Sequence, residues 1–441
     1  MSASEGLGAR PHRRGALGAV MSVLNRVAGA PVVERLGLKK TVDRTLYEAT
    51  RTGFRAAGAA TRTFTAARKL GSPPRPPAVP GSGVFDLTPT DEQQMIVETV
   101  REFAAERLRP AAAGADDKCA PPGDLLATAT ELGVTLLGVP EELGGVATER
   151  STVTNVLVAE ALAAGDMGLA LACLAPAAVS NALVLWGNEE QQATYLPAFT
   201  GENVPAAALA IQEPAALFDP FSLRTKAYRT AGGFRLTGVK SLVPRAAAAE
   251  LFVVAADVDG RGPALFIVES SSVTVESEPA MGLRGAGTGR VLLDQVTVPA
   301  SALLDADYAE CVRLARLGWC ALAVGTGQAV LDYVIPYVND REAFGEPVSH
   351  RQGVAFKVAD IGTELDGMRL LTYRASARAA SGLPFAREVA LARKLCADKG
   401  MAIGSDGVQL LGGHGFVKEH PVERWYRDLR AVGVMEGAVL V

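Results

Sequence analysis

The hydrophobic pattern of this chain changes its period twice, and that change limits the folds that it can adopt. Apolar residues recur at helical spacing up to about residue 205 and again from about residue 307. Between these blocks lie six short β-type runs, separated by Gly, Pro and charged turns, at Ala207–Ile211, Gly233–Leu236, Leu251–Ala255, Ala264–Val268, Val273–Glu276 and Val291–Val298. This arrangement favours a small antiparallel barrel or sandwich between two helical regions.

The spacing also predicts the helices on both sides. Thr90 is placed to cap a helix that continues through Phe103. Pro336 removes a helical hydrogen bond and is expected to kink the helix that contains it. The remaining helices are predicted at Gly123–Leu132, Ser151–Ala164, Met167–Trp186, Glu189–Phe199, Asp307–Val338, Val354–Ala380 and Phe385–Leu411. Long antiparallel helices at the end of the chain suit a bundle.

A chain of 441 residues is long enough for more than one core. The predicted fold class is α+β, mostly α, with an N-terminal helical domain, a middle antiparallel β domain and a C-terminal four-helix-bundle-like domain. The predicted segments are a basic helical extension (1–70), a Pro/Gly linker (71–84), the N-terminal helical domain (85–205), the middle β domain (206–300) and the C-terminal helical domain (301–441).

Charge is distributed unevenly along the chain. Met1–Gly71 holds 13 Lys/Arg against 4 Asp/Glu, whereas the rest holds 31 against 44, which sums to the net charge of −4. A basic arm on an acidic body indicates an interaction segment, and nucleic-acid binding by the whole protein is not expected. Within residues 1–70 a basic amphipathic helix either contacts a membrane or a partner, or packs on its own protein.

The cysteines and the apolar stretches indicate the cellular compartment of the protein. The five cysteines lack CxxC or Cys/His spacing, which favours a reducing compartment without structural disulfides or a metal site. The longest apolar stretch, Leu317–Val338, is interrupted by Gln328 and Asp332 and is therefore predicted to be a buried helix. We expect a cytoplasmic protein, with residues 1–70 as a potential peripheral membrane contact.

One stretch near the end of the sequence carries the strongest chemical signal. Gln409–Glu436 opens with a Gly-rich turn, where glycine lets the backbone approach a ligand closely. It closes with Glu436, a lone carboxylate among apolar neighbours. A carboxylate desolvated in such surroundings is suited to act as a general base for a weakly acidic C–H. The alternative is a solvated carboxylate on a frayed tail.

This stretch resembles the C-terminal signature of the acyl-CoA dehydrogenase family, Q-x-x-G-G-x-G-[FY], P-[VI]-E-[RK], R-D and a final Glu-Gly. The likeness extends from about Phe85 to the end of the chain and includes the R-x-x-F-G-x-P motif that begins at Arg341. The matching C-terminal residues are Gln409, Gly412, Gly413, Gly415, Phe416, Pro421, Val422, Glu423, Arg424, Arg427, Asp428, Glu436 and Gly437.

The resemblance implies FAD as cofactor and an acyl-CoA as substrate. Glu436 would be the catalytic base, because the position at which other members carry theirs on the long helix is Ala315 here. Arg341 would hold the cofactor pyrophosphate, often across a dimer interface. Cofactor contacts are implied for Gln212, Leu242, Pro244, Arg341, Phe344, Gln352, Gln409, Leu410, Gly412 and Gly413, and substrate contacts for Phe218, Arg316 and Gly437.

Two flavin-facing strips depart from the family pattern. Gln212 replaces a hydroxyl residue, and Phe218 replaces a Ser that usually contacts cofactor or substrate. Leu242 stands where a Trp covers the flavin, and Pro244 stands where a Ser or Thr hydroxyl reaches it. Proline has neither an N–H nor a hydroxyl, so it cannot make that hydrogen bond, whereas the Gln212 amide offers a substitute donor.

The family also continues beyond its Glu-Gly-Thr with another helix. A shortened sequence, a partner chain or the Met1–Gly71 arm would account for the difference.

Three functions fit these residues. The first is flavin-dependent α,β-dehydrogenation of a saturated acyl-CoA to the trans-2-enoyl-CoA in fatty acid β-oxidation, by a homodimer or homotetramer that passes electrons to an electron-transfer flavoprotein. The alternative is a non-catalytic or half-site subunit of a hetero-oligomeric acyl-CoA dehydrogenase with a degenerate flavin site. A flavoenzyme that uses oxygen on a non-CoA substrate is disfavoured by the retained Glu436. The acyl chain, and the choice between CoA and an acyl carrier protein, are left open.

Overall fold

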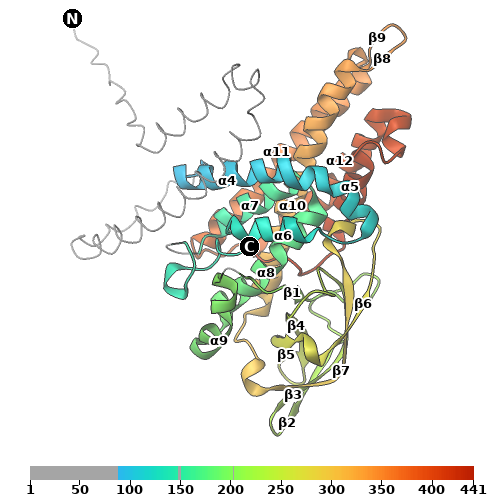
Figure 1. The fold of residues 1–441 in the computed structure, drawn as a ribbon. Coiled ribbons are helices and arrows are strands. Elements are labelled where there is room, and N and C mark those ends of the chain that lie inside the picture. Colours follow the sequence, from blue (N-terminus) through green and yellow to red (C-terminus); the bar gives the residue numbers. More distant parts are fainter. Residues whose placement is uncertain (1–87, 148–149, 202) are drawn as a thin grey trace, which may run out of the picture. The chain divides into compact units, whose positions relative to one another are not determined.

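The computed structural model describes residues 88–147, 150–201 and 203–441, so the predicted helices of residues 1–70 lie outside the described part. Contacts divide the chain into Met1–Gly83 and Val84–Val441, and all described residues belong to the second unit. This unit begins with a block of helices (Figure 1). They are α4 (Asp91–Phe103), α5 (Arg109–Lys118), α6 (Gly123–Glu131), α7 (Thr152–Ala163), α8 (Met167–Trp186) and α9 (Glu189–Thr200), with a π-helical turn at Ala104–Leu108 between α4 and α5.

Two of these helices begin at capping boxes, in which a side chain and the residue three positions later satisfy each other's backbone N–H groups. Thr90 Oγ1 accepts from the Gln93 N–H at 3.2 Å, and Gln93 Oε1 accepts from the Thr90 N–H at 3.0 Å. Asn188 and Gln191 do the same for α9, with both distances 2.8 Å. The predicted cap at Thr90 is thus confirmed, and the four later helices of this block begin and end within two residues of their predicted limits.

The β region forms one seven-stranded sheet with a mixed pattern of strand directions. Most neighbours are antiparallel, as predicted for this domain, but β1 and β2 both run parallel to β4, and for these two pairings the prediction was wrong. β4 is buried on both faces, and such a continuous apolar run does not reveal the direction of its partners. The strands are β1 (Ala207–Ala210), β2 (Lys226–Thr230), β3 (Gly233–Val243), β4 (Leu251–Val258), β5 (Gly262–Glu269), β6 (Thr274–Ser277) and β7 (Gly289–Pro299). β2 was not predicted, because only one of its residues is buried.

β1 and β2 pair with successive parts of the same strand, and a loop leaves the sheet between them. β1 pairs with Leu251–Val254, and β2 pairs with Asp257 and Val258. The intervening segment, residues 211–225, carries Gln212 and Phe218. Glu213 closes the base of this loop, since its carboxylate accepts from the Arg224 N–H at 2.7 Å and the Thr225 N–H at 2.9 Å.

A fully buried ion pair fastens the same loop to β3. Lys240 Nζ lies 2.8 Å from Glu213 Oε1 and donates to the Ile211 carbonyl at 3.2 Å, and the two side chains are 0% and 1% exposed. Burial lowers the pKa of Lys240 to about 8, although the Glu213 charge opposes that shift. Charges without access to water are tolerated only when they are paired, so each of these residues depends on the other.

The C-terminal region is built from three long helices and a short one. α10 (Tyr308–Asp340) remains one helix through Pro336, so the predicted helix is confirmed, whereas its kink stays a prediction. Both α8 and α10 have the length and apolarity of a membrane span, but 89% and 83% of their most apolar windows are buried inside the protein. The other elements are a hairpin of β8 (Glu342–Ala343) and β9 (Glu346–Pro347), then α11 (Gln352–Ala380), α12 (Ala386–Leu411) and α13 (Val422–Leu429).

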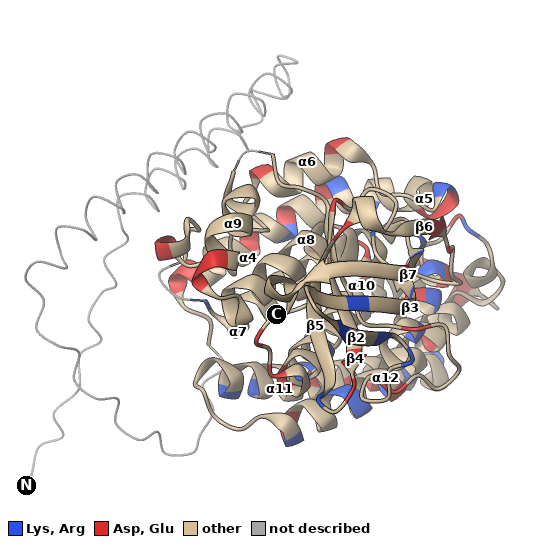
Figure 2. Cartoon of the chain, turned by 90° about the horizontal axis from the view of Figure 1, so that it is seen from below, with Lys and Arg blue, Asp and Glu red and all other residues tan. Residues whose placement is uncertain are grey.

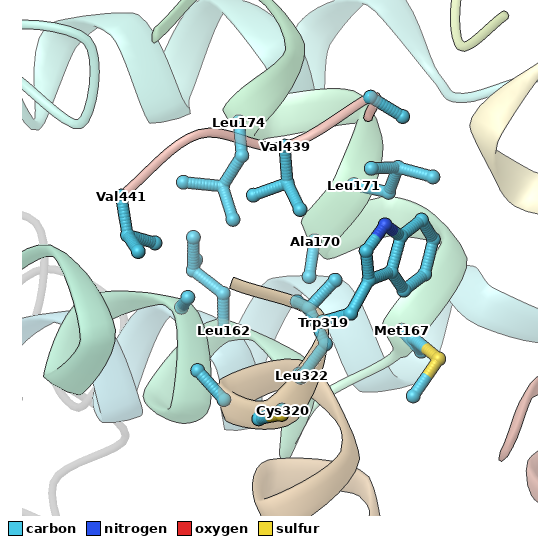
Figure 3. Packing of buried hydrophobic residues seen from close by; sticks show 14 of the residues in the cluster. Leu162, Met167, Ala170, Leu171, Leu174, Trp319, Cys320, Leu322, Val439 and Val441 are labelled. Atoms are coloured by element: carbon cyan, nitrogen blue, oxygen red, sulfur yellow. The ribbon is translucent and has the colours of Figure 1, made fainter. Parts of the chain in front are cut away.

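The last residues pack into the main core (Figure 3). Val439 and Val441 lie among Leu171 and Leu174 of α8 and Trp319 of α10, and their exposure is 1% and 2%. Polar side chains of the surrounding helices satisfy the backbone of this segment: Trp319 Nε1 donates to the Gly437 carbonyl at 2.8 Å, and Asn181 Nδ2 donates to the Leu440 carbonyl at 2.7 Å. Residues 437–441 are therefore held by hydrogen bonds as well as by apolar burial.

A buried carboxyl group joins the end of α13 to the β region. Asp428 is 1% exposed and accepts from the Leu283 N–H at 2.6 Å. Burial, and then the neighbouring charge of Asp166, raise the pKa of Asp428 to about 8, and the contacts with Leu283, Arg427 and Arg424 only partly oppose them. At neutral pH the folded state therefore holds a proton that the unfolded chain releases.

This difference predicts a pH dependence of stability. The stabilisation from Asp428 is fully present below its unfolded pKa of 3.8 and is lost as the pH rises toward about 8. Asp428→Asn keeps an acceptor for Leu283 but removes the titration, so its free energy of unfolding is expected to fall less steeply than that of the wild type over this range. Urea unfolding at a series of pH values measures both slopes, and parallel profiles would contradict the assignment. Asp398→Asn, in an exposed residue of α12, is the control.

Candidate active site

Glu436 lies in the segment that follows the last helical turn of the chain. That turn, η8 (Arg430–Gly433), continues from α13, and Glu436 is 7% exposed, so the predicted burial of this carboxylate is confirmed and the frayed-tail alternative is wrong. Its backbone N–H donates to Gln212 Oε1 at 2.9 Å. This contact joins the end of the chain to the loop that leaves the sheet after β1.

The surroundings of Glu436 differ from the apolar pocket that the sequence predicted. Arg316 of α10 meets the carboxylate side-on, with Nε 3.0 Å from both oxygens and Nη2 2.7 Å from Oε1. Burial alone would lower the pKa of Arg316, but the hydrogen bond and charge of Glu436 outweigh burial and raise that pKa. Arg316, predicted to contact substrate, thus lies beside the predicted base and is its principal partner.

A second arginine approaches the same carboxylate from α12. Arg393 Nη2 donates to the Met435 carbonyl at 2.6 Å and lies 3.8 Å from Glu436 Oε1. Burial lowers the pKa of Arg393, although the Glu436 charge opposes that shift. This contact was not predictable from the sequence, since Arg393 stands in an ordinary helical pattern that does not show which residue it faces.

The carboxylate borders a cavity of about 370 Å³ between α10 and α12. Its charged lining consists of Arg313, Arg316, Arg393, Lys394 and Glu436, and small apolar residues of α12 together with Val389 and Gly433 complete the wall. Glu436 is therefore buried and yet adjoins a space that a ligand can enter, which a proton-abstracting base requires.

Gly437 has no room for a side chain. Its φ is +73°, and a Cβ at this position would lie 2.7 Å from the Cβ of Ile211. Only glycine adopts such a conformation without strain, and here it allows the chain to turn inward directly after Glu436. The glycine that was predicted as a substrate contact therefore sets the direction of the backbone beside the base.

Gly437→Ala is expected to destabilise the protein by about 2–4 kcal/mol, because it adds a positive-φ penalty to a clash with the buried Ile211 side chain. Denaturant unfolding measures the change. Gly353→Ala in α11 is the matched control, since a Cβ there meets no atom within 4 Å. A Gly437→Ala protein as stable as this control would show that the tail relaxes freely.

The predicted flavin-facing residues of the β region lie near the Gln212 end of the site. The Gln212 carbonyl accepts from the Ser241 N–H at 3.0 Å, which places the two departing strips side by side. Leu242 has a φ of +52° and donates its N–H to Glu278 at 2.8 Å, and Pro244 is buried. Phe218 is half-buried on the loop that leaves the sheet.

The other predicted cofactor residues gather at the far end of the bundle. Arg341 follows α10, and 25 positions on this helix separate it from Arg316, which corresponds to about 37 Å at 1.5 Å per residue. Tyr337 joins this end of α10 to the Gly-rich turn, since its hydroxyl lies 2.7 Å from His414 Nδ1. This group comprises Arg341, Phe344, Gln352, Gln409, Gly412 and Gly413, which are partly or fully exposed, and Leu410, which is buried.

One copy of the chain therefore does not bring all the predicted cofactor residues together. Gln212, Leu242 and Pro244 lie on the β side, and the group around Arg341 lies beyond the other end of α10 (Figure 1). Sequence motifs give the residue types but not the distance between them. The residues that sequence reasoning missed are Arg393, Trp319 and Asn181, and only Asn181 gave a signal, as a polar residue within a buried apolar helix.

Comparison with known proteins gives a consistent result over nearly the whole described region. The chain matches the family descriptions "Acyl-CoA dehydrogenase, N-terminal domain" over residues 90–202, "middle domain" over 208–296 and "C-terminal domain" over 308–439. It is 32% identical to the short/branched chain specific acyl-CoA dehydrogenase of Rattus norvegicus, over 79% of this chain and 83% of that protein. An acyl-CoA dehydrogenase of Bacillus subtilis is 31% identical, over 79% and 95% of the two chains.

Solved structures agree with the sequence matches. Butyryl-CoA dehydrogenase of Megasphaera elsdenii superposes with a TM-score of 0.74 at 28% identity, over 80% of this chain and 96% of that one. A glutaryl-CoA dehydrogenase of Mycobacterium smegmatis in complex with FADH2 gives a TM-score of 0.72 at 25% identity, over 79% and 92%. The resemblance of residues 409–437 is thereby confirmed, and the chain belongs to the acyl-CoA dehydrogenase family.

Proposed function

We propose that this protein removes hydrogen from the α and β carbons of a saturated acyl-CoA and forms the trans-2-enoyl-CoA, with FAD as cofactor. The observation that carries the proposal is the buried Glu436 carboxylate, fixed by Arg316 and bordering a cavity. The names of the relatives support the reaction class. They leave the acyl group open.

The two oxygens of the Glu436 carboxylate have different contacts, and this difference supports different tasks for them in our proposal. Oε1 is near both Nε and Nη2 of Arg316 and lies 3.8 Å from Arg393, whereas Oε2 has Arg316 Nε as its one hydrogen-bond donor among the described residues. In our proposal Oε2 takes the α proton, because it gives up fewer contacts, and Oε1 stays anchored on the guanidinium. Bound FAD would supply the acceptor for the β hydride.

The thioester carbonyl needs a hydrogen-bond donor to stabilise the negative charge that develops on it. In our proposal Gln212 is this donor. Its Oε1 accepts from the Glu436 N–H, and its Nε2, which has no hydrogen-bond partner among the described residues, stays available. Polarisation by Gln212 and proton removal by Glu436 would then act on neighbouring atoms of the substrate.

The exposed residues fit FAD if two copies of the chain share the site. Arg341 makes no side-chain ion pair within the described residues, and Phe344 is 96% exposed in a left-handed conformation. An unpaired guanidinium next to an exposed aromatic ring suits a pyrophosphate and a nucleoside base. We propose a homodimer or homotetramer, in which Arg341, Phe344, Gln352, Gln409, Gly412 and Gly413 of one copy complete the flavin site begun by Gln212, Leu242 and Pro244 of another.

The absorption spectrum of the purified protein tests the function. We expect a flavin spectrum that bleaches anaerobically with at least one member of a panel of straight, branched and carboxylated acyl-CoAs, with the enoyl-CoA detected by mass spectrometry. A colourless protein that reconstitutes with FAD but bleaches with no acyl thioester would overturn the proposal and favour the half-site subunit. An electron-transfer flavoprotein as acceptor and a cytoplasmic location also stand as proposals.

A further inference from the structure

The cavity beside Glu436 has more positive than negative charge. Four cations and one carboxylate line it, and Lys and Arg positions recur along α12 on this side of the molecule (Figure 2). Arg313 pairs with Asp307 at 3.3 Å and Lys394 with Asp398, and neither aspartate lines the cavity. The inner pair, Arg316 and Arg393, shares Glu436 as its one carboxylate among the described residues.

Among the cations that line the cavity, Arg393 is the one with a buried donor that lacks a hydrogen-bond partner in the described part of the chain. Its side chain is 13% exposed, its Nη2 is bound to the Met435 carbonyl, and its Nη1 is buried without a hydrogen-bond partner. Burying an unsatisfied donor of a charged group is unfavourable, so native proteins rarely leave one without a partner. A guanidinium accommodates two oxygens of one carboxylate or phosphate in its plane.

We propose that this cavity is a binding site for a small carboxylate or phosphate, which the guanidinium groups of Arg393 and Arg316 hold. The bound anion would share Arg316 and Arg393 with Glu436. Filling the cavity would therefore change the contacts of the Glu436 carboxylate. The anion is either a free solute or a carboxylate carried by the ligand that reaches Glu436. The first form does not depend on the proposed reaction, and the second rests on it.

Two kinds of variant test the site. Arg393→Met removes the unpaired donor and keeps the side-chain length, and Lys418→Gln removes a charge paired with Asp117 elsewhere on the surface as its control. Ala390 lines the cavity on an exposed face of α12. Ala390→Glu places a tethered carboxylate one helical turn before Arg393, and Ala390→Gln supplies the same bulk without charge.

The direct measurement is calorimetric titration of the purified protein with inorganic phosphate and with succinate, at constant ionic strength set by chloride. We expect saturable binding of at least one of these anions to the wild type and to Lys418→Gln, weakened about tenfold or more in Arg393→Met. Ala390→Glu should abolish binding, whereas Ala390→Gln should weaken it by no more than about threefold.

A second arm separates the two sources of the anion. If the carboxylate belongs to the ligand, Arg393→Met should lower kcat/KM for a thioester with a terminal carboxylate about tenfold more than for its uncharged counterpart. Two outcomes would overturn the inference. In the first, neither free anion saturates the wild type, and Arg393→Met lowers kcat/KM equally for the two thioesters. In the second, anion binding survives both Arg393→Met and Ala390→Glu. Titration needs no turnover, so a protein that binds anions but bleaches with no acyl-CoA would contradict the proposed reaction alone.

Discussion

Glu436→Gln is expected to lower the rate of acyl-CoA dehydrogenation by about 10²–10⁴-fold while FAD stays bound, because the variant loses the general base and keeps an acceptor for Arg316. The amide oxygen of Gln still accepts a hydrogen bond from Arg316, and the backbone contacts of residue 436 with Gln212 are unchanged. Arg316 is 30% exposed, so water can solvate its charge when the carboxylate is gone.

Stopped-flow bleaching of the flavin by the best acyl-CoA measures this effect. Glu419→Gln removes the charge of an exposed glutamate from the loop before α13 and should bleach at the wild-type rate. Bleaching by Glu436→Gln within a few-fold of the wild type would show that another group takes the proton. Loss of flavin from the purified variant would show that Glu436 supports cofactor binding instead.

Lys240→Met is expected to be the most destabilising single substitution in the β region, at about 3–5 kcal/mol, because it leaves the Glu213 carboxylate buried without its counter-ion. Glu213 would retain only the backbone N–H groups of Arg224 and Thr225 as donors. The free energy of unfolding from guanidinium titration measures the loss.

A partly exposed ion pair of the same sheet serves as the control for the buried Lys240–Glu213 pair. Lys226 of β2 pairs with Asp257 at 2.7 Å, but these side chains are 44% and 28% exposed, so Lys226→Met should cost about 1 kcal/mol or less. The double variant Glu213→Gln/Lys240→Met removes both charges and keeps an acceptor for the loop, and it should recover part of the loss. If Lys240→Met were no worse than Lys226→Met, water would have to reach the buried pair.

The positions of the helices and most strands could be predicted from the sequence, but the direction of strand pairing and the distances between site residues could not. Apolar spacing and the cap at Thr90 located the helices because both are local properties of the chain. The parallel pairing of β1 and β2 with β4 was not predictable, since an apolar strand carries no mark of its neighbours' direction. Family motifs likewise gave the residue types of the cofactor site but not its division between the two ends of α10.

The same limit applies to Glu436. Its apolar neighbours in the chain predicted burial, and the carboxylate is buried. Its charged neighbours, Arg316 and Arg393, come from α10 and α12, and a helical pattern in which charged residues recur does not show which arginine turns inward. The charged groups around a side chain depend on tertiary packing. Residues adjacent in the chain therefore predicted the burial of Glu436 but not its arginine partners.

The loop at residues 211–225 has an evolutionary consequence. Because β1 and β2 are anchored at both ends of the loop on a single strand, β4, residues between them can change in length or chemistry without shifting the hydrogen-bonding register of the sheet. Segment 215–221, which includes the fully exposed Leu217, is thus a natural position for exchange between relatives. Transplanting this segment from another acyl-CoA dehydrogenase should therefore leave the pairing of β1 and β2 with β4 intact.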